Sequence, residues 1–162
     1  MEIEAQKILE VVEAVLKDKD VQPGFPDDNG NTNTTWCNRG ANRIATNLGY
    51  DMSIFLHDRG INWTTANMMY ENAVAKAKEI YAAEAQVMAN AGDLILAASF
   101  NNNGPGHVAI VCPCIEDYNN EIGPLIAETG WKCRVTHSKY AFNIYKFEPR
   151  YFIIPKKEVN NG

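Results

Sequence analysis

Cys37 and His107 are the two residues of this chain whose types and surroundings best fit catalysis. Cys37 follows the polar segment Asn33-Thr34-Thr35-Trp36 and stands at the start of a predicted amphipathic helix. The unpaired N–H groups and the positive dipole end of a first helical turn favour a thiolate, the nucleophilic form of cysteine. His107 follows the glycine-rich turn Gly104-Pro105-Gly106 and begins an apolar run typical of a strand. A histidine that accepts the thiol proton completes a nucleophilic pair, so these residues predict covalent catalysis.

Glu128 is the predicted third member of this site. It lies within the apolar run Leu125-Ile126-Ala127-Glu128-Thr129, where a buried carboxylate needs a polar partner. Catalysis by such a pair needs a group that orients the imidazole, and Glu128 on a strand beside His107 would supply it. One alternative is that Glu128 faces solvent on an open face of the sheet. Another is that His137 takes the third position, whereas His57 lies in a polar, irregular segment typical of the surface.

The reaction also needs donors for the oxyanion that forms on the attacked carbonyl. The backbone N–H of Cys37 is one predicted donor, because first-turn N–H groups have no partner within their own helix. A side-chain donor near the sulfur is also needed, and Asn31 and Asn33 are the candidates.

Helices must position the cysteine, and the spacing of apolar residues predicts four of them. Residues 5–16 carry one apolar stripe, in a helix that should end near residue 20. Residues 23–33 are rich in Pro, Gly, Asp and Asn, which predicts a loop. The second helix is capped by Thr34 or Thr35 and ends before Gly49.

The other two helices follow an irregular segment. One opens at Thr64 or Thr65 and keeps helical spacing as far as Ile80, and a shorter one covers residues 83–89 and ends at Gly92.

Apolar runs after the helices predict strands. They cover residues 93–100, 107–112 and 125–131, with a final pair at 144–147 and 151–155. A tight glycine-rich turn joins the first two, which predicts an antiparallel pair. Because helices come first and an antiparallel sheet follows, we expect an α+β fold with one domain over residues 1–162.

One loop pattern bears on metal binding. Asp27, Asn29 and Asn31 alternate like the first ligands of a calcium loop. Thr32 and Asn38, however, stand where such loops have glycine and glutamate. We therefore expect no cofactor, with calcium at these three residues as the alternative.

The remaining cysteines are Cys112, Cys114 and Cys133. Cys112-Pro113-Cys114 is not a zinc spacing, and no paired histidines accompany it. Two disulfides are the alternative, but a chain of 162 residues with a large core does not need them. These three cysteines are predicted to be strand or core residues.

Charge and the amino-terminal sequence exclude several classes of partner. The formal net charge is −5 and the pI is near 5.2, so neither nucleic acid nor an anionic membrane surface is expected as a partner. Residues 1–5 lack the pattern of a signal peptide, and no run reaches the roughly 18 apolar residues of a membrane span. We expect synthesis in the cytoplasm, with action elsewhere only after lysis or leaderless export.

Four features together resemble the CHAP family and its NlpC-type relatives. They are the helix-start Cys37, then Gly92-Asp93 before an apolar strand, then Gly106-His107, then Glu128 three residues before Trp131. The resemblance implies a papain-like fold, with amino-terminal helices packed on a carboxy-terminal antiparallel sheet. It also implies a Cys37–His107–Glu128 triad.

The chain departs from the family's pattern in two places. Asn38-Arg39-Gly40 replaces the aromatic-rich run that usually follows the CHAP cysteine, and the upstream glutamine of papain-like enzymes is missing.

The resemblance further implies a peptidoglycan hydrolase that works through a thioester acyl-enzyme. It would be a cysteine endopeptidase or an N-acetylmuramoyl-L-alanine amidase, with a stem peptide or glycopeptide as its substrate and the periplasm or cell wall as its site of action. Amidase effectors of type VI secretion share the same core, and an effector would also have an immunity or delivery protein as partner. The alternatives are an inactive CHAP-like binding domain and a papain-like effector that cuts proteins.

Overall fold

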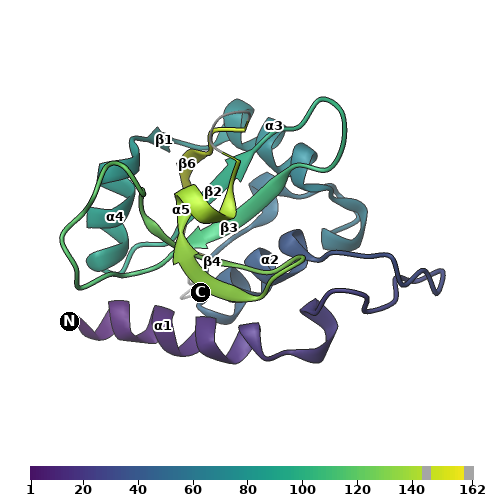
Figure 1. The fold of residues 1–162 in the computed structure, drawn as a ribbon, viewed down its shortest axis with the longest axis horizontal. Helices are drawn as coiled ribbons and strands as arrows, with labels where there is room; N and C mark the ends of the chain where they lie inside the picture. The colour runs from purple at the N-terminus through teal and green to yellow at the C-terminus, as the bar shows by residue number, and fades with distance from the viewer. Residues whose placement is uncertain (144–146, 159–162) are drawn as a thin grey trace.

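An antiparallel sheet with helices on both faces makes up the fold (Figure 1). This computed structural model describes residues 1–143 and 147–158. Within them, six strands pair antiparallel in the order β1-β6-β2-β3-β4-β5. The strands are β1 (Glu79–Ile80), β2 (Ile95–Ser99), β3 (His107–Val111), β4 (Leu125–Glu128), β5 (Arg134–His137) and β6 (Arg150–Ile153). The helices are α1 (Ile3–Leu16), α2 (Cys37–Asn47), α3 (Ala66–Lys76), α4 (Ala82–Asn90) and α5 (Ser138–Ala141). The predicted α+β class is confirmed.

Strand β2 is buried on both faces, which explains its continuous apolar sequence. Leu96 and Ala98 face one hydrophobic cluster, which includes residues of α1, α2 and α3. Ile95 and Ala97 face a second cluster, which includes residues of α4. The sheet is therefore the middle of three layers, and α5 lies in front of its strands in Figure 1.

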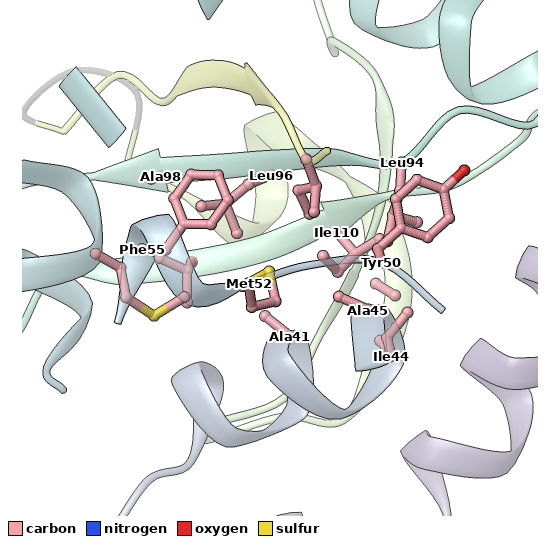
Figure 2. Close-up of a cluster of buried hydrophobic side chains, with 14 of the residues drawn as sticks. Ala41, Ile44, Ala45, Tyr50, Met52, Phe55, Leu94, Leu96, Ala98 and Ile110 are labelled. Carbon is pink, nitrogen blue, oxygen red and sulfur yellow. The ribbon is translucent and has the colours of Figure 1, made fainter. Parts of the chain in front are cut away.

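Helix α2 packs its apolar stripe directly under the sheet. Figure 2 shows Ala41, Ile44 and Ala45 pointing from α2 toward Leu96 and Ile110. Ile44 and Ile110 are each at most 1% exposed. Because this packing fixes the helix against β3, it also fixes the helix start beside the end of β3 that carries His107.

The first helix is shorter than predicted. It ends at Leu16, and Asp18 is already extended, with φ −62° and ψ 133°. The side chain of Gln22 folds back and donates to the backbone oxygens of Leu16 and Asp18, both at 2.9 Å. These bonds satisfy carbonyls that a longer helix would have bonded itself, so the chain turns before Asp20.

The third helix begins as predicted but ends early. The backbone N–H of Met68 donates to the Thr65 hydroxyl at 3.1 Å, so Thr65 is the cap. The helix ends at Lys76, and the prediction that it reaches Ile80 is wrong. Ile80 lies in β1, opposite Tyr151 of β6. Helical spacing of an apolar residue cannot reveal a pairing with a strand so distant in sequence.

The predicted strands are confirmed in place, with shorter bounds. Residues 93–100, 107–112 and 125–131 contain β2, β3 and β4, and 151–155 overlaps β6. β2 and β3 pair antiparallel, as predicted. Most of the strand predicted at 144–147 lies outside the described residues. Neither β5 nor α5 was predicted.

None of the helices in the described residues combines the length and the apolar composition that a membrane span requires.

Candidate functional site

Cys37 is the first residue of α2, and its thiol is buried at the inner side of the helix start. Trp36 is the N-cap residue, so the prediction of a threonine cap is wrong. The Thr34 hydroxyl and the Trp36 indole N–H both donate to the backbone oxygen of Phe25. These bonds hold the segment that leads to the cysteine. Cys37 is 9% exposed, which agrees with its predicted place on the apolar stripe.

The turn before His107 is built around Asn67 of α3. The Asn67 amide nitrogen donates to the backbone oxygens of Asn101 and Gly104, at 2.9 and 3.1 Å. Its amide oxygen accepts from the backbone N–H of Asn101 at 3.0 Å. A Cβ at Gly106 would lie 2.3 Å from that amide oxygen, so only glycine fits there. The turn therefore delivers His107 to the start of β3 in one fixed position.

Glu128 faces inward and binds two cationic side chains. Its Oε1 lies 2.8 Å from Nε2 of His107, and its Oε2 accepts from Nε of Arg134 at 2.7 Å. Glu128 is 7% exposed, so the alternative that it faces solvent is wrong. Burial raises the pKa of the Glu128 carboxyl, but the bonds from His107 and Arg134 outweigh burial and hold it below its usual range. The carboxylate is thus charged and held at both oxygens.

The end of β4 docks on the start of α2. The Thr129 hydroxyl donates to the backbone oxygen of Trp36 at 2.7 Å. A Cβ at Gly40 would lie 2.0 Å from the Thr129 hydroxyl oxygen, so this contact requires glycine in the first turns of α2. The docking brings the strand that carries Glu128 against the helix that carries Cys37.

Cys37 and His107 meet where these elements converge. A Cβ at Gly130 would lie 3.8 Å from both Cβ of Cys37 and Cε1 of His107. Because Nε2 of His107 faces Glu128, Nδ1 is the ring nitrogen left for the thiol. The ring of Phe142 packs against the imidazole at a centroid distance of 4.9 Å.

The electrostatics of this pair favour a thiolate and an imidazolium. Burial raises the pKa of the Cys37 thiol, but the hydrogen bond and positive charge of His107, with the N–H groups of Val108 and Asn38, outweigh it and lower the pKa. Burial lowers the pKa of His107, but Cys37 and Glu128 together raise it to about 9. Both shifts favour the thiolate–imidazolium ion pair, the form of the site that is ready for nucleophilic attack.

The pair opens into a cleft of about 370 Å³. The residues that line it are Thr35, Cys37, Pro105, Gly106, His107, Glu128, Gly130, Trp131, Lys132, Arg134, Tyr140 and Ala141. The structure thus brings the three predicted catalytic residues into one hollow. Such a cleft, with a polarised nucleophile at its floor, can hold a carbonyl compound and form an acyl-enzyme.

Asn31 and Asn33, the predicted oxyanion donors, are exposed and do not line this cleft. The amide oxygen of Asn31 accepts from the backbone N–H of Asn33 at 3.0 Å, so it closes the loop locally. Thr35 lines the cleft two residues before the cysteine and carries a hydroxyl donor. Of these three upstream residues, only Thr35 lines the cleft.

The other histidines lie outside the cleft. His57 is exposed, as predicted, and its Nδ1 accepts from the backbone N–H of Arg59 at 3.0 Å. Nδ1 of His137 lies 2.9 Å from the backbone oxygen of Gly123. The alternative that His137 orients the imidazole of His107 is therefore wrong, because Glu128 contacts that imidazole.

The predicted calcium residues form a turn. One carboxylate oxygen of Asp27 accepts from the backbone N–H groups of Asn29 and Asn31, both at 2.9 Å. Closing this turn accounts for the alternation of Asp and Asn. Within residues 1–143 and 147–158, no group of three His, Cys, Asp or Glu side chains is arranged to hold a metal ion.

All four cysteines have free thiols. Cys112 is fully buried at the end of β3, as predicted for a core residue, and burial raises its pKa to about 12. Cys114 and Cys133 are partly buried and lie outside the strands. The prediction that they are strand or core residues is therefore wrong for these two cysteines.

Several residues of the site were not foreseen from the sequence. Arg134 binds Glu128, Asn67 organises the turn before His107, and Phe142 supports the imidazole. No local pattern marks them, because each acts on a residue from another element. Thr35 was considered only as a helix cap, and its distance of two residues from Cys37 is the signal that could have identified it.

No protein-family model matches the chain, and no curated protein matches it closely enough to count as a relative. The function is therefore inferred from the geometry of the site and from the resemblance in the sequence.

The ion pair predicts how the reactivity of Cys37 depends on pH. A free peptide thiol has a pKa near 8.5 and loses about a hundredfold of its thiolate between pH 8.5 and pH 6. Because the Cys37 pKa is lowered, its alkylation by iodoacetamide should fall less than that of a free thiol over this range. At pH 6 it should exceed that of a free thiol. Peptide mass spectrometry would measure labelling at Cys37 separately from Cys114 and Cys133.

His107→Ala is the matched control for this measurement. Without the imidazole, burial is opposed only by the N–H groups of Val108 and Asn38, so the pKa of the Cys37 thiol rises. Alkylation of Cys37 at pH 6 should then fall below that of the free thiol. Equal pH profiles for the wild type and the variant would rule out the ion pair.

Proposed function

We propose that the protein is a cysteine hydrolase that cuts amide bonds in peptidoglycan, as an endopeptidase or as an N-acetylmuramoyl-L-alanine amidase. The observation that carries this proposal is the linked Glu128–His107–Cys37 arrangement in an open cleft. The substrate class comes from the resemblance to the CHAP family and its NlpC-type relatives, whose papain-like fold is part of the same proposal.

The first half of the reaction uses the ion pair directly. The Cys37 thiolate attacks the carbonyl carbon of the amide, and the negative charge moves to the carbonyl oxygen. The backbone N–H of Cys37 and the hydroxyl of Thr35 donate to this oxyanion. As the carbon–nitrogen bond breaks, the His107 imidazolium gives its proton to the leaving amine, and a thioester remains on Cys37.

The second half reverses these roles. The neutral His107 takes a proton from a water molecule, and the hydroxide attacks the thioester carbon. The carbon–sulfur bond breaks, the carboxylic acid leaves, and the thiolate–imidazolium pair is restored. Glu128 stabilises the imidazolium in both halves and holds Nδ1 toward the sulfur.

The unusual segment after Cys37 supports an active site over an inactive binding domain. The Asn38 amide donates to the backbone oxygen of Thr64 at 2.7 Å. Arg39 stacks on Trp36 at 3.6 Å and donates to the backbone oxygen of Asp20 at 2.9 Å. Gly40 makes room for Thr129. These residues hold the helix start in place and leave the cleft free.

Digestion of purified sacculi tests the proposal. The wild-type protein should release soluble fragments, and mass spectrometry of their ends identifies the bond. New amino termini within the peptide indicate an endopeptidase, and new lactyl ends indicate an amidase. Intact sacculi together with cleaved protein substrates would favour the effector that acts on proteins. Intact sacculi and intact proteins would favour the binding domain.

A further inference from the structure

The connection from β4 to β5 forms one wall of the cleft. Gly130 has φ +133°, a conformation that favours glycine, directly after the residue that docks on α2. The chain then continues as Trp131 and Lys132, and both side chains line the cleft. Because Gly130 lies beside both Cys37 and His107, this wall stands next to the reacting atoms.

Lys132 is a cation without a protein partner in this wall. The other charged groups of the cleft are paired: Arg134 and His107 both bind Glu128, and His107 also contacts Cys37. In the part of the chain that the structure describes, Lys132 makes no ion pair and its side chain donates no hydrogen bond. The cleft therefore carries one unbalanced positive charge in a protein of net charge −5.

Two exposed aromatic side chains line the same cleft as Lys132. Trp131 is 73% exposed and Tyr140 is 58% exposed. Large apolar rings left in water beside a reactive centre are typical of surfaces that a ligand covers. A cleft that offers one cation and two rings suits a peptide segment with one anionic group, since the rings can cover its apolar atoms.

We infer that Lys132 binds a carboxylate that the substrate carries close to the scissile amide, while Trp131 and Tyr140 cover apolar atoms of the same segment. The inference rests on the proposed function, because it assigns the substrate of the same cleft. The carboxylate belongs either to an internal residue next to the scissile bond or to the end of the peptide. Both sources present the same chemistry to the lysine.

Three synthetic peptides separate these sources. The first is N-acetyl-L-alanyl-γ-D-glutamyl-L-lysyl-D-alanine amide, whose only carboxylate is on the glutamyl residue. The second is its isoglutaminyl counterpart, which has no carboxylate. The third is the isoglutaminyl peptide with a free terminal carboxylate. The wild type should cut the first or the third with a kcat/KM about tenfold above that of the second, the effect of one charge-assisted hydrogen bond.

Variants of Lys132 identify the residue responsible. Lys132→Gln should remove the preference for the carboxylate peptide and leave kcat/KM for the second peptide within about twofold. Lys132→Arg should keep the preference. Lys76→Gln is the matched control, because it removes the same charge from an exposed position at the end of α3, outside the cleft. It should change neither the preference for the carboxylate peptide nor kcat/KM for the second peptide. Equal cleavage of all three peptides by the wild type, or a preference that survives Lys132→Gln, would overturn the inference.

Binding to the Cys37→Ala variant separates this inference from the proposed reaction. NMR titration of that variant should show about tenfold tighter binding of the favoured carboxylate peptide than of the second peptide. The added Lys132→Gln substitution should abolish the difference. Selective binding without any hydrolysis by the wild type would refute the proposed reaction and support the carboxylate site. Hydrolysis by the wild type without selective binding would support the proposed reaction and refute the carboxylate site.

Discussion

The Cys37→Ser variant is expected to digest sacculi at least about a thousandfold more slowly than the wild type, the scale on which hydrolases lose activity with their nucleophile. The hydroxyl of serine is far less acidic than a thiol, so His107 cannot hold it as an anion. The fold should survive, because the substitution changes one atom in a site that packing of α2 and β4 already defines. Release of soluble fragments measures the activity, and thermal unfolding measures the fold.

Two further variants make this result specific. His107→Ala should be as inactive as Cys37→Ser, because burial then keeps the thiol protonated. Cys114→Ser makes the same chemical change at a cysteine outside the cleft and should keep wild-type activity. Full activity of Cys37→Ser with an unchanged unfolding temperature would refute the mechanism. Loss of activity in Cys114→Ser would show that the assay responds to a loss of stability and not to the loss of the nucleophile.

The Glu128→Gln variant is expected to lose about a hundredfold or more in kcat, through the tautomer of His107. Arg134 only donates hydrogen bonds, so the amide oxygen of the new glutamine must face it. The amide NH₂ group then faces Nε2 of His107. Nε2 has to accept a hydrogen bond from this group, so it can no longer carry a proton. The ring proton moves to Nδ1, where it prevents acceptance of the thiol proton.

The double variant Glu128→Gln/Arg134→Gln tests that explanation. Without the guanidinium, the amide oxygen at position 128 is free to accept from Nε2–H of His107, as in a Cys-His-Asn site. The double variant should recover at least about tenfold over Glu128→Gln, although each single change damages the site. Imidazole ¹⁵N shifts would report the tautomer directly. A double variant no better than the single one would refute the donor conflict, and wild-type activity of Glu128→Gln would remove Glu128 from the mechanism.

The secondary structure was predicted best where neighbours in the sequence determine it. The apolar stripe places Cys37 at the first turn of α2 with its side chain inward, and Thr65 caps α3 as expected. Such features depend on contacts within a few residues, so a local pattern is sufficient. The β2–β3 pair was predicted for the same reason, because one tight turn joins its strands.

Several of the errors lie where distant segments or the path of a loop decide the outcome. Ile80 has helical spacing but pairs with Tyr151, and β6 joins the sheet between β1 and β2 although it comes last in the chain. At the site, Asn31 and Asn33 close their own loop while Thr35 reaches the cleft. Which of these polar side chains faces the cleft depends on the path of the loop, and the sequence does not show this.

By itself, the sequence determined which groups are able to react: a cysteine at a helix start, a histidine at a strand start and a carboxylate in an apolar strand. Only the tertiary structure decided that they meet. Thr129 docks on Trp36 across Gly40, and this contact brings β4 to α2, while Arg134 holds the second oxygen of Glu128. The physical reason is that side-chain type and helical register depend on the local chain. The alignment of three groups depends on packing between elements that lie far apart in the sequence.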